Sequence, residues 1–159
     1  MNLGSLKATV KVEGTAYGSY GAAQAIFLQS MSTFTDGTGT GKSNKVVVRE
    51  DVTLSATSAD VDLAGSYTDA FGATVTLTKL HGILITHTSE DASILTVAQA
   101  SSNGVANLFT GASDGVKVPD GGALFYVNNE GLAITAGTGD KLTLTASATS
   151  VYSMVFWGE

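Results

Sequence analysis

Gly41-Lys42-Ser43 is the first group of residues that could do chemistry, because it has the ending of a phosphate-binding P-loop. That motif also needs a glycine five positions before Gly41 and a helix after it, where backbone N–H groups hold the phosphate. Asp36 occupies the glycine position and would repel the anion, and the Val46-Val47-Val48 run that follows is typical of a strand. The sequence therefore predicts a flexible Gly-rich linker over residues 36–45 and no nucleotide site.

The two histidines, His81 and His87, are candidate nitrogen ligands for a metal ion. They lie six residues apart on one predicted strand, so their backbones are roughly 20 Å apart at about 3.3 Å per residue. One ion with bonds of ~2 Å cannot be shared over that distance. Because the alternation also places Ile83 and Ile85 on the same face, we expect two histidines in a packed strand and no shared metal.

Oxygen ligands for calcium are offered by two acidic pairs, Asp60 with Asp62 and Glu90 with Asp91. Neither pair follows the EF-hand spacing, so surface solvation is their ordinary role. For hydrolysis, the many Ser and Thr residues have only two histidines to serve them as a base, and no pair of carboxylates is marked out for sugar cleavage. We therefore expect no metal, no cofactor and no enzymatic activity.

The composition indicates which elements must carry these side chains. The chain has 159 residues, 43% hydrophobic and 14% charged, with 19 glycines, one proline, no cysteine and a net charge of −6. This length can bury a real core, and the glycines suit short strands joined by tight turns. The negative charge argues against a nucleic-acid partner, and no apolar run approaches the length of a membrane helix. Low charge density favours a surface that meets another protein.

Alternation with period two predicts strands along the whole chain. In the first strand Leu6, Ala8, Val10 and Val12 share one face, and a loop is expected over Gly14–Gly21. The next segment, Ala22–Phe34, fits a short helix or a strand, and the neighbouring composition favours the strand.

Further along the chain, Val46, Val48, Val52 and Leu54 share a parity, and Glu50 interrupts their run. A bulge at Glu50 would turn its charge outward. The strongest strand is Leu80–Thr88, whose apolar run is typical of a strand covered on both faces. The remaining strands are short and separated by turn signals, as in an antiparallel β-sandwich, jelly-roll-like in its finer form. The predicted division is an N-terminal strand or arm over 1–35, the linker over 36–45 and the sandwich over 46–159. A single domain over 1–159 is the alternative.

The C-terminal strand has apolar residues on both faces. Tyr152, Met154 and Phe156 face one way, whereas Val155 and Trp157 face the other. Such a strand is either central in the core or covered by a second subunit. The candidate subunit or capsid interface therefore joins this strand to the N-terminal one, and consists of Leu6, Val10, Val12, Tyr152, Phe156 and Trp157.

Three stretches resemble small virion proteins of tailed bacteriophages. They are residues 36–46 (DGTGTGKSNKV), 62–75 (DLAGSYTDAFGATV) and 133–142 (AITAGTGDKL), and their order and spacing match over about three quarters of the chain. The resemblance implies a structural protein of the virion, placed on the capsid surface as a decoration or cement protein and assembled in the bacterial cytoplasm.

The implied partners are the major capsid protein and further copies of the chain, as a homotrimer, with no nucleic acid and no membrane. The alternative is a protein of the tail, neck or fibre, such as a receptor- or glycan-binding module. In that case the side chains expected to stack on sugars are Tyr17, Tyr20, Tyr67 and Trp157.

Overall fold

The computed structural model describes residues 5–17, 23–55, 57–89, 92–111 and 114–159, with the backbone alone over 12–17 and 23–28. This part of the chain contains twelve strands and no helix, which confirms the all-β prediction. The strands are β1 (Ser5–Tyr17), β2 (Ala23–Thr35), β3 (Lys45–Ser55), β4 (Ser58–Asp62), β5 (Ala64–Thr68), β6 (Thr74–Thr76), β7 (Lys79–Thr88), β8 (Ile94–Gln99), β9 (Gly115–Pro119), β10 (Ala123–Ala133), β11 (Lys141–Ala146) and β12 (Thr149–Gly158).

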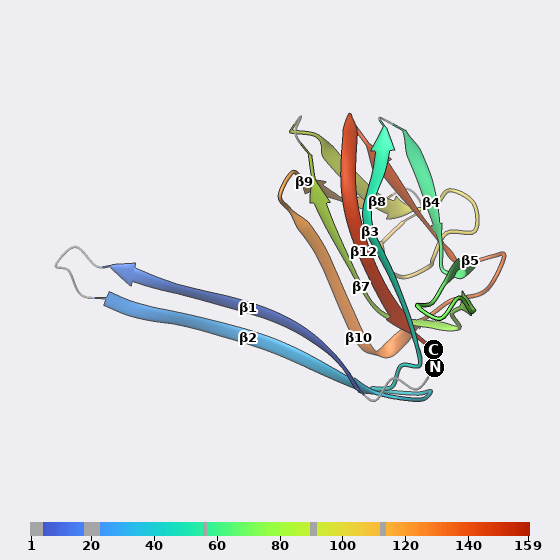
Figure 1. Cartoon of the computed structure of the whole chain (residues 1–159), viewed down its shortest axis with the longest axis horizontal. Coiled ribbons are helices and arrows are strands. Elements are labelled where there is room, and N and C mark those ends of the chain that lie inside the picture. Colours follow the sequence, from blue (N-terminus) through green and yellow to red (C-terminus); the bar gives the residue numbers. More distant parts are fainter. Residues whose placement is uncertain (1–4, 18–22, 56, 90–91, 112–113) are drawn as a thin grey trace.

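Two four-stranded antiparallel sheets form the body of the molecule (Figure 1). One has the order β10-β7-β12-β3 and the other the order β4-β11-β8-β9. Their facing sides share one apolar core, to which the first sheet contributes Ile83, Ile85 and Phe156 and the second contributes Leu95 and Leu144. The body is therefore a β-sandwich, as the alternation predicts.

A bulge in β3 confirms the expectation at Glu50. Tyr152 pairs with Val52 and Met154 with Arg49, so two residues of β3 lie opposite Ser153 alone. The extra residue changes which parity faces the core, because the side-chain period of a strand is two. Val46 and Val48 are consequently on the outer side, whereas Val52 and Leu54, which have the same parity, face the core.

β1 and β2 form a two-stranded hairpin that projects from the body (Figure 1). We call this hairpin, Ser5–Thr35, the arm. Its pairs run without a break from Ser5 with Thr35 to Tyr17 with Ala23. The strand preferred for Ala22–Phe34 is thus confirmed. The loop expected over Gly14–Gly21 begins later than predicted, because the ladder continues to Tyr17. Gly14 pairs with Ile26 inside the ladder, and a glycine weakens a strand without ending it.

Residues 36–44, the predicted linker, form a hydrogen-bonded turn between the arm and the body. Positive φ angles at Gly37, Gly39 and Gly41 reverse the chain there. The Gly41 N–H donates to the Asn129 carbonyl at 2.9 Å, and the Ser43 hydroxyl donates to the Gly158 carbonyl at 2.9 Å. These long-range partners, which a reading of local composition does not reveal, hold the segment against β10 and β12.

Candidate interaction surfaces

The base of the arm packs on the outer face of the β10-β7-β12-β3 sheet. There the register aligns two apolar rows across all four strands: Phe125, Leu84, Val155 and Val48 in one, and Val127, Gly82, Trp157 and Val46 in the other. Ala8 and Phe34 of the arm are buried with Trp157 in a cluster separate from the core of the body. The arm therefore covers part of an apolar sheet face.

Trp157 is the centre of this cluster and is 3% exposed. Its indole lies directly over Gly82, since a Cβ at that glycine would be 2.0 Å from the ring. The Phe34 ring contacts it edge-on from the arm, at 6.1 Å between centroids, and the Phe125 ring from β10 at 6.4 Å. The alternation correctly predicts that Trp157 faces away from Tyr152, Met154 and Phe156. Its cover, however, is the arm of the same chain.

The remaining predicted interface residues separate into three places. Tyr152 and Phe156 are in the core of the body. Leu6 is half-buried at the base of the arm, and Val10, further along the arm, is 42% exposed. The backbone of Val12 continues the ladder opposite Leu28, and its side chain lies outside the described residues. Of the six residues, the structure thus places Leu6 with Trp157 in the cluster under the arm and Tyr152 with Phe156 in the core of the body.

A buried carboxylate fastens the turn to the body. Glu159, whose side chain is 6% exposed, forms an ion pair of 2.8 Å with Lys79 and accepts a hydrogen bond from the Gly39 N–H. Burial raises the pKa of this carboxyl, but the hydrogen bonds from Lys79 and Gly39 and the charges of Lys79 and His81 together hold that pKa below its usual range. The Glu159 backbone carbonyl also accepts from Thr78 and Lys79, so both ends of the residue are fixed.

His81 does not share a face with Ile83, Ile85 and His87, contrary to prediction. It is an extra residue of β7, because Gly158 pairs with Leu80 while Trp157 pairs with Gly82. The bulge turns the ring towards the arm, 5.5 Å from the Phe34 ring, and its Nδ1 bonds to the Asn128 carbonyl at 3.0 Å. The neighbouring strand β10 shifts its register beside this bulge, between Val127 and Leu132. Alternation within one strand does not predict such a shift.

His87 is buried in the sandwich, where both ring nitrogens have partners. Nδ1 contacts the Val118 carbonyl at 3.0 Å, and Nε2 contacts the Ser93 hydroxyl at 3.2 Å, which bonds to Ser150 at 2.7 Å. The two histidines therefore have separate surroundings. Among the described residues, no three His, Asp or Glu side chains are placed to hold a metal ion.

A second part of the surface is the turn between β5 and β6, where the sequence predicts a loop over Ser66–Ala73. The two strands pair across a tight turn that carries Phe71, which is 80% exposed. A groove of about 390 Å³ runs beside it, lined by Val46, Val48, Arg49, Thr68, Asp69 and Ala70. In Figure 1, β5 lies on the side of the body away from the arm.

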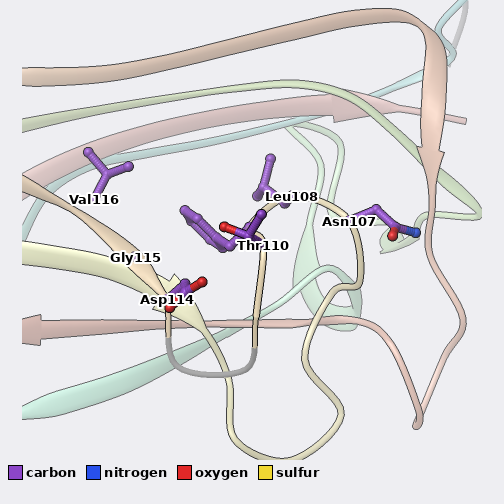
Figure 2. Close-up of a pocket in the computed structure, with 7 residues that line it drawn as sticks. Asn107, Leu108, Thr110, Asp114, Gly115 and Val116 are labelled. Carbon is purple, nitrogen blue, oxygen red and sulfur yellow. The ribbon is translucent and has the colours of Figure 1, made fainter.

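A hollow of about 700 Å³ lies beside β9 (Figure 2). Its lining residues are Asn107, Leu108, Phe109, Thr110, Asp114, Gly115 and Val116. The polar side chains are few, and Asn107 lies apart from Thr110 and Asp114 (Figure 2). Among the lining residues that the structure describes, Asp114 is the one carboxylate and none is a histidine.

Two of the four aromatic residues considered for sugar stacking have neighbours on their rings. Trp157 is covered by the arm, and the Tyr67 ring packs on Phe156 with the Arg49 guanidinium 5.8 Å from its centroid. Tyr20 and the side chain of Tyr17 lie outside the described residues. The structure therefore does not bring these four rings to one exposed platform.

Comparison of the chain with protein families, with curated proteins and with solved structures found no match. No helix in the described ranges is long and apolar enough to cross a membrane. The surfaces above are therefore the basis on which function is inferred.

Proposed function

We propose that this chain is a structural, non-enzymatic subunit of a bacteriophage particle, a decoration or cement protein that binds the assembled capsid through its arm. The observation that carries the proposal is the projecting arm itself. Beyond its base, this two-stranded ribbon displays apolar side chains such as Val10, 42% exposed, and Met31, 56% exposed.

An isolated two-stranded ribbon is marginally stable in water, so a long projecting one needs a partner. Within the described residues, β1 pairs only with β2, and each strand has one backbone edge without a ladder partner. Such an edge can accept a strand from another protein, with hydrogen bonds supplying affinity and alternate side chains supplying specificity. The major capsid protein is the partner that the sequence resemblance implies.

We also infer that the body is a jelly roll. Eight strands in two four-stranded antiparallel sheets are the content of that architecture. The chain also passes repeatedly between the sheets, from β3 to β4, from β9 to β10 and from β11 to β12. This topology supports the resemblance to virion proteins at the level of fold, and the function rests on the arm.

Several weak contacts suffice for a subunit of this kind when copies act together. A homotrimer with three arms would engage several capsid subunits, and the first contact raises the effective concentration for the others. Because it binds the assembled shell and not the free subunits, such a trimer stabilises the shell by mass action.

The test is addition of the protein to capsids of the parent phage that lack it. We expect the wild type to bind and to raise the melting temperature of the capsids, and Val10→Lys to weaken binding at least tenfold. Val116→Lys is the matched control, because Val116 lies on the body with a nearly identical exposure of 41%. Failure of the wild type to bind, or equal binding by Val10→Lys, overturns the proposal and brings a role in the tail or fibre to the front.

A further inference from the structure

Phe71 is the most exposed large hydrophobic side chain of the described residues, at 80%. An exposed aromatic ring on a turn is costly to keep in water unless another protein covers it, since an aromatic side chain buries about 150–250 Å². The turn belongs to the stretch 62–75, one of those that carry the sequence resemblance, and the arm makes no use of it.

The turn that carries Phe71 is already fixed in place. The Asp69 carboxylate accepts hydrogen bonds from the Phe71 N–H at 2.8 Å and from the Ala73 N–H at 3.0 Å. The backbone adds a bond from the Gly72 N–H to the Asp69 carbonyl at 3.0 Å, and Gly72 has a φ of +83°. Because the turn is ordered before binding, a partner that covers Phe71 loses little affinity to ordering it.

The groove beside the turn is the complement of this projection. It is apolar along β3, where Val48 is 54% exposed, and β3 is an edge strand of its sheet. Its lining also includes two opposite charges, Arg49 and Asp69, and no ion pair joins these two residues in the described chain. One patch thus contains a projection, a groove, a cation and an anion.

We propose that Phe71 of one copy inserts into the groove between β3 and the β5–β6 turn of the next copy, and that this contact closes the oligomer. Only a second copy is certain to present the same projection beside the same groove, and rotation places the Arg49 of one copy against the Asp69 of another. The inference rests on the proposed assembly of copies. It assigns that assembly to a surface beside the base of the arm, and the exposed outer part of the arm, with Val10 and Met31, remains open for the capsid.

Sedimentation of the isolated protein tests the contact without any capsid. We expect the wild type to sediment as an oligomer at micromolar concentration and Phe71→Ser to raise the dissociation constant of assembly about 30-fold or more, as for a buried aromatic anchor. Val116→Ser, which removes an exposed apolar side chain from β9, should leave assembly unchanged. A monomeric wild type, or an unchanged Phe71→Ser, overturns the inference.

Cross-linking then tests which surfaces meet, since the chain has no cysteine. A mixture of Ala73→Cys and Val48→Cys chains, both of which keep Phe71, should form a disulfide-linked pair under mild oxidation, whereas Ala73→Cys mixed with Val116→Cys should not; Ala73 is exposed on the same turn as Phe71. Because each chain carries one cysteine, a bond between the two variants must cross between copies. Absence of the first pair in an intact oligomer overturns the inference, and capsid binding, measured separately, decides the proposed function. A dimer that cross-links in this way supports the contact and excludes the trimer.

Discussion

The strands of the body and the strands of the arm have the same alternating pattern, but their faces are covered in different ways. In the body, both sheets close on one large core, so each inner side chain has neighbours from two layers. Among the arm side chains that the structure describes, Ala8 and Phe34 alone are buried, and Val10 and Met31 are exposed further out. The alternating strands of the body therefore bury their apolar faces within the chain, whereas the described outer part of the arm leaves apolar side chains exposed.

The fastening of the arm is correspondingly small. It consists of the cluster around Trp157 and the turn held by Glu159, Asn129 and Gly158. Local stability follows the number of buried contacts, so the arm should open at a lower free energy than the body. The following four changes test this difference, from the largest expected effect to the smallest.

The largest effect is expected for Phe156→Ala in the body. Phe156 is 1% exposed and packs on Tyr67 at 5.7 Å between ring centroids, so its removal leaves a cavity in the shared core. The free energy of unfolding should fall by about 3–5 kcal/mol, as measured by urea denaturation. A loss below about 1 kcal/mol would show that the body is not held mainly by this core.

Phe34→Ala should release the arm and leave the body folded. Phe34 contacts Trp157 and His81 from β2, and neither sheet of the body contains it. We expect amide exchange in β1 and β2 to accelerate by two to three orders of magnitude, which corresponds to about 3–4 kcal/mol of local opening free energy.

Exchange in β7 and β12 serves as the internal control for Phe34→Ala and should change much less. If amide exchange accelerated equally in all four strands, the arm and the body would unfold as one unit. That result would contradict the expected difference in stability between the arm and the body.

The turn should loosen at acidic pH because of Glu159. Its pKa is lowered in the folded state, so its contribution is complete above the ordinary carboxyl pKa and is lost as the pH falls through the lowered value. Glu159→Gln should remove about 1 kcal/mol at neutral pH, a modest value because Lys79 is 40% exposed to solvent.

The measurement is amide exchange of β1 at pH 7 and at about pH 3, compared between the wild type and Glu159→Gln. The wild type should lose protection on acidification more than the variant does. An equal loss in both proteins would assign the acid sensitivity to other carboxylates.

The smallest effect is expected for Ser153→Ala at the bulge of β3. The Ser153 hydroxyl accepts a hydrogen bond of 3.1 Å from the Asp51 N–H, at an exposed position. Water can replace this bond, so the free energy of unfolding should fall by about 0.5 kcal/mol, as measured by the shift in melting temperature. A loss of 2 kcal/mol or more would show that the bulge, and not the core alone, determines the stability of the body.

Much of this protein was determined by the sequence itself, because alternation is a local property. It predicts most of the strands, though not β5 or β9, and it predicts the all-β sandwich, the bulge at Glu50 and the opposite faces of Phe156 and Trp157. Even the strand preference for the ambiguous segment 22–34 followed from neighbouring composition, and β2 confirms it.

Only the tertiary structure decided which surfaces meet. Trp157 is covered by residues about 120 positions earlier in the chain, and Glu159 holds a turn that composition alone describes as a flexible linker. His81 faces the arm because β10 departs from its register beside it. Phe71 is exposed because β5 and β6 close a tight turn at the edge of β3. Each of these outcomes depends on pairing between distant segments, and a local period of two contains no information about which distant segment lies opposite.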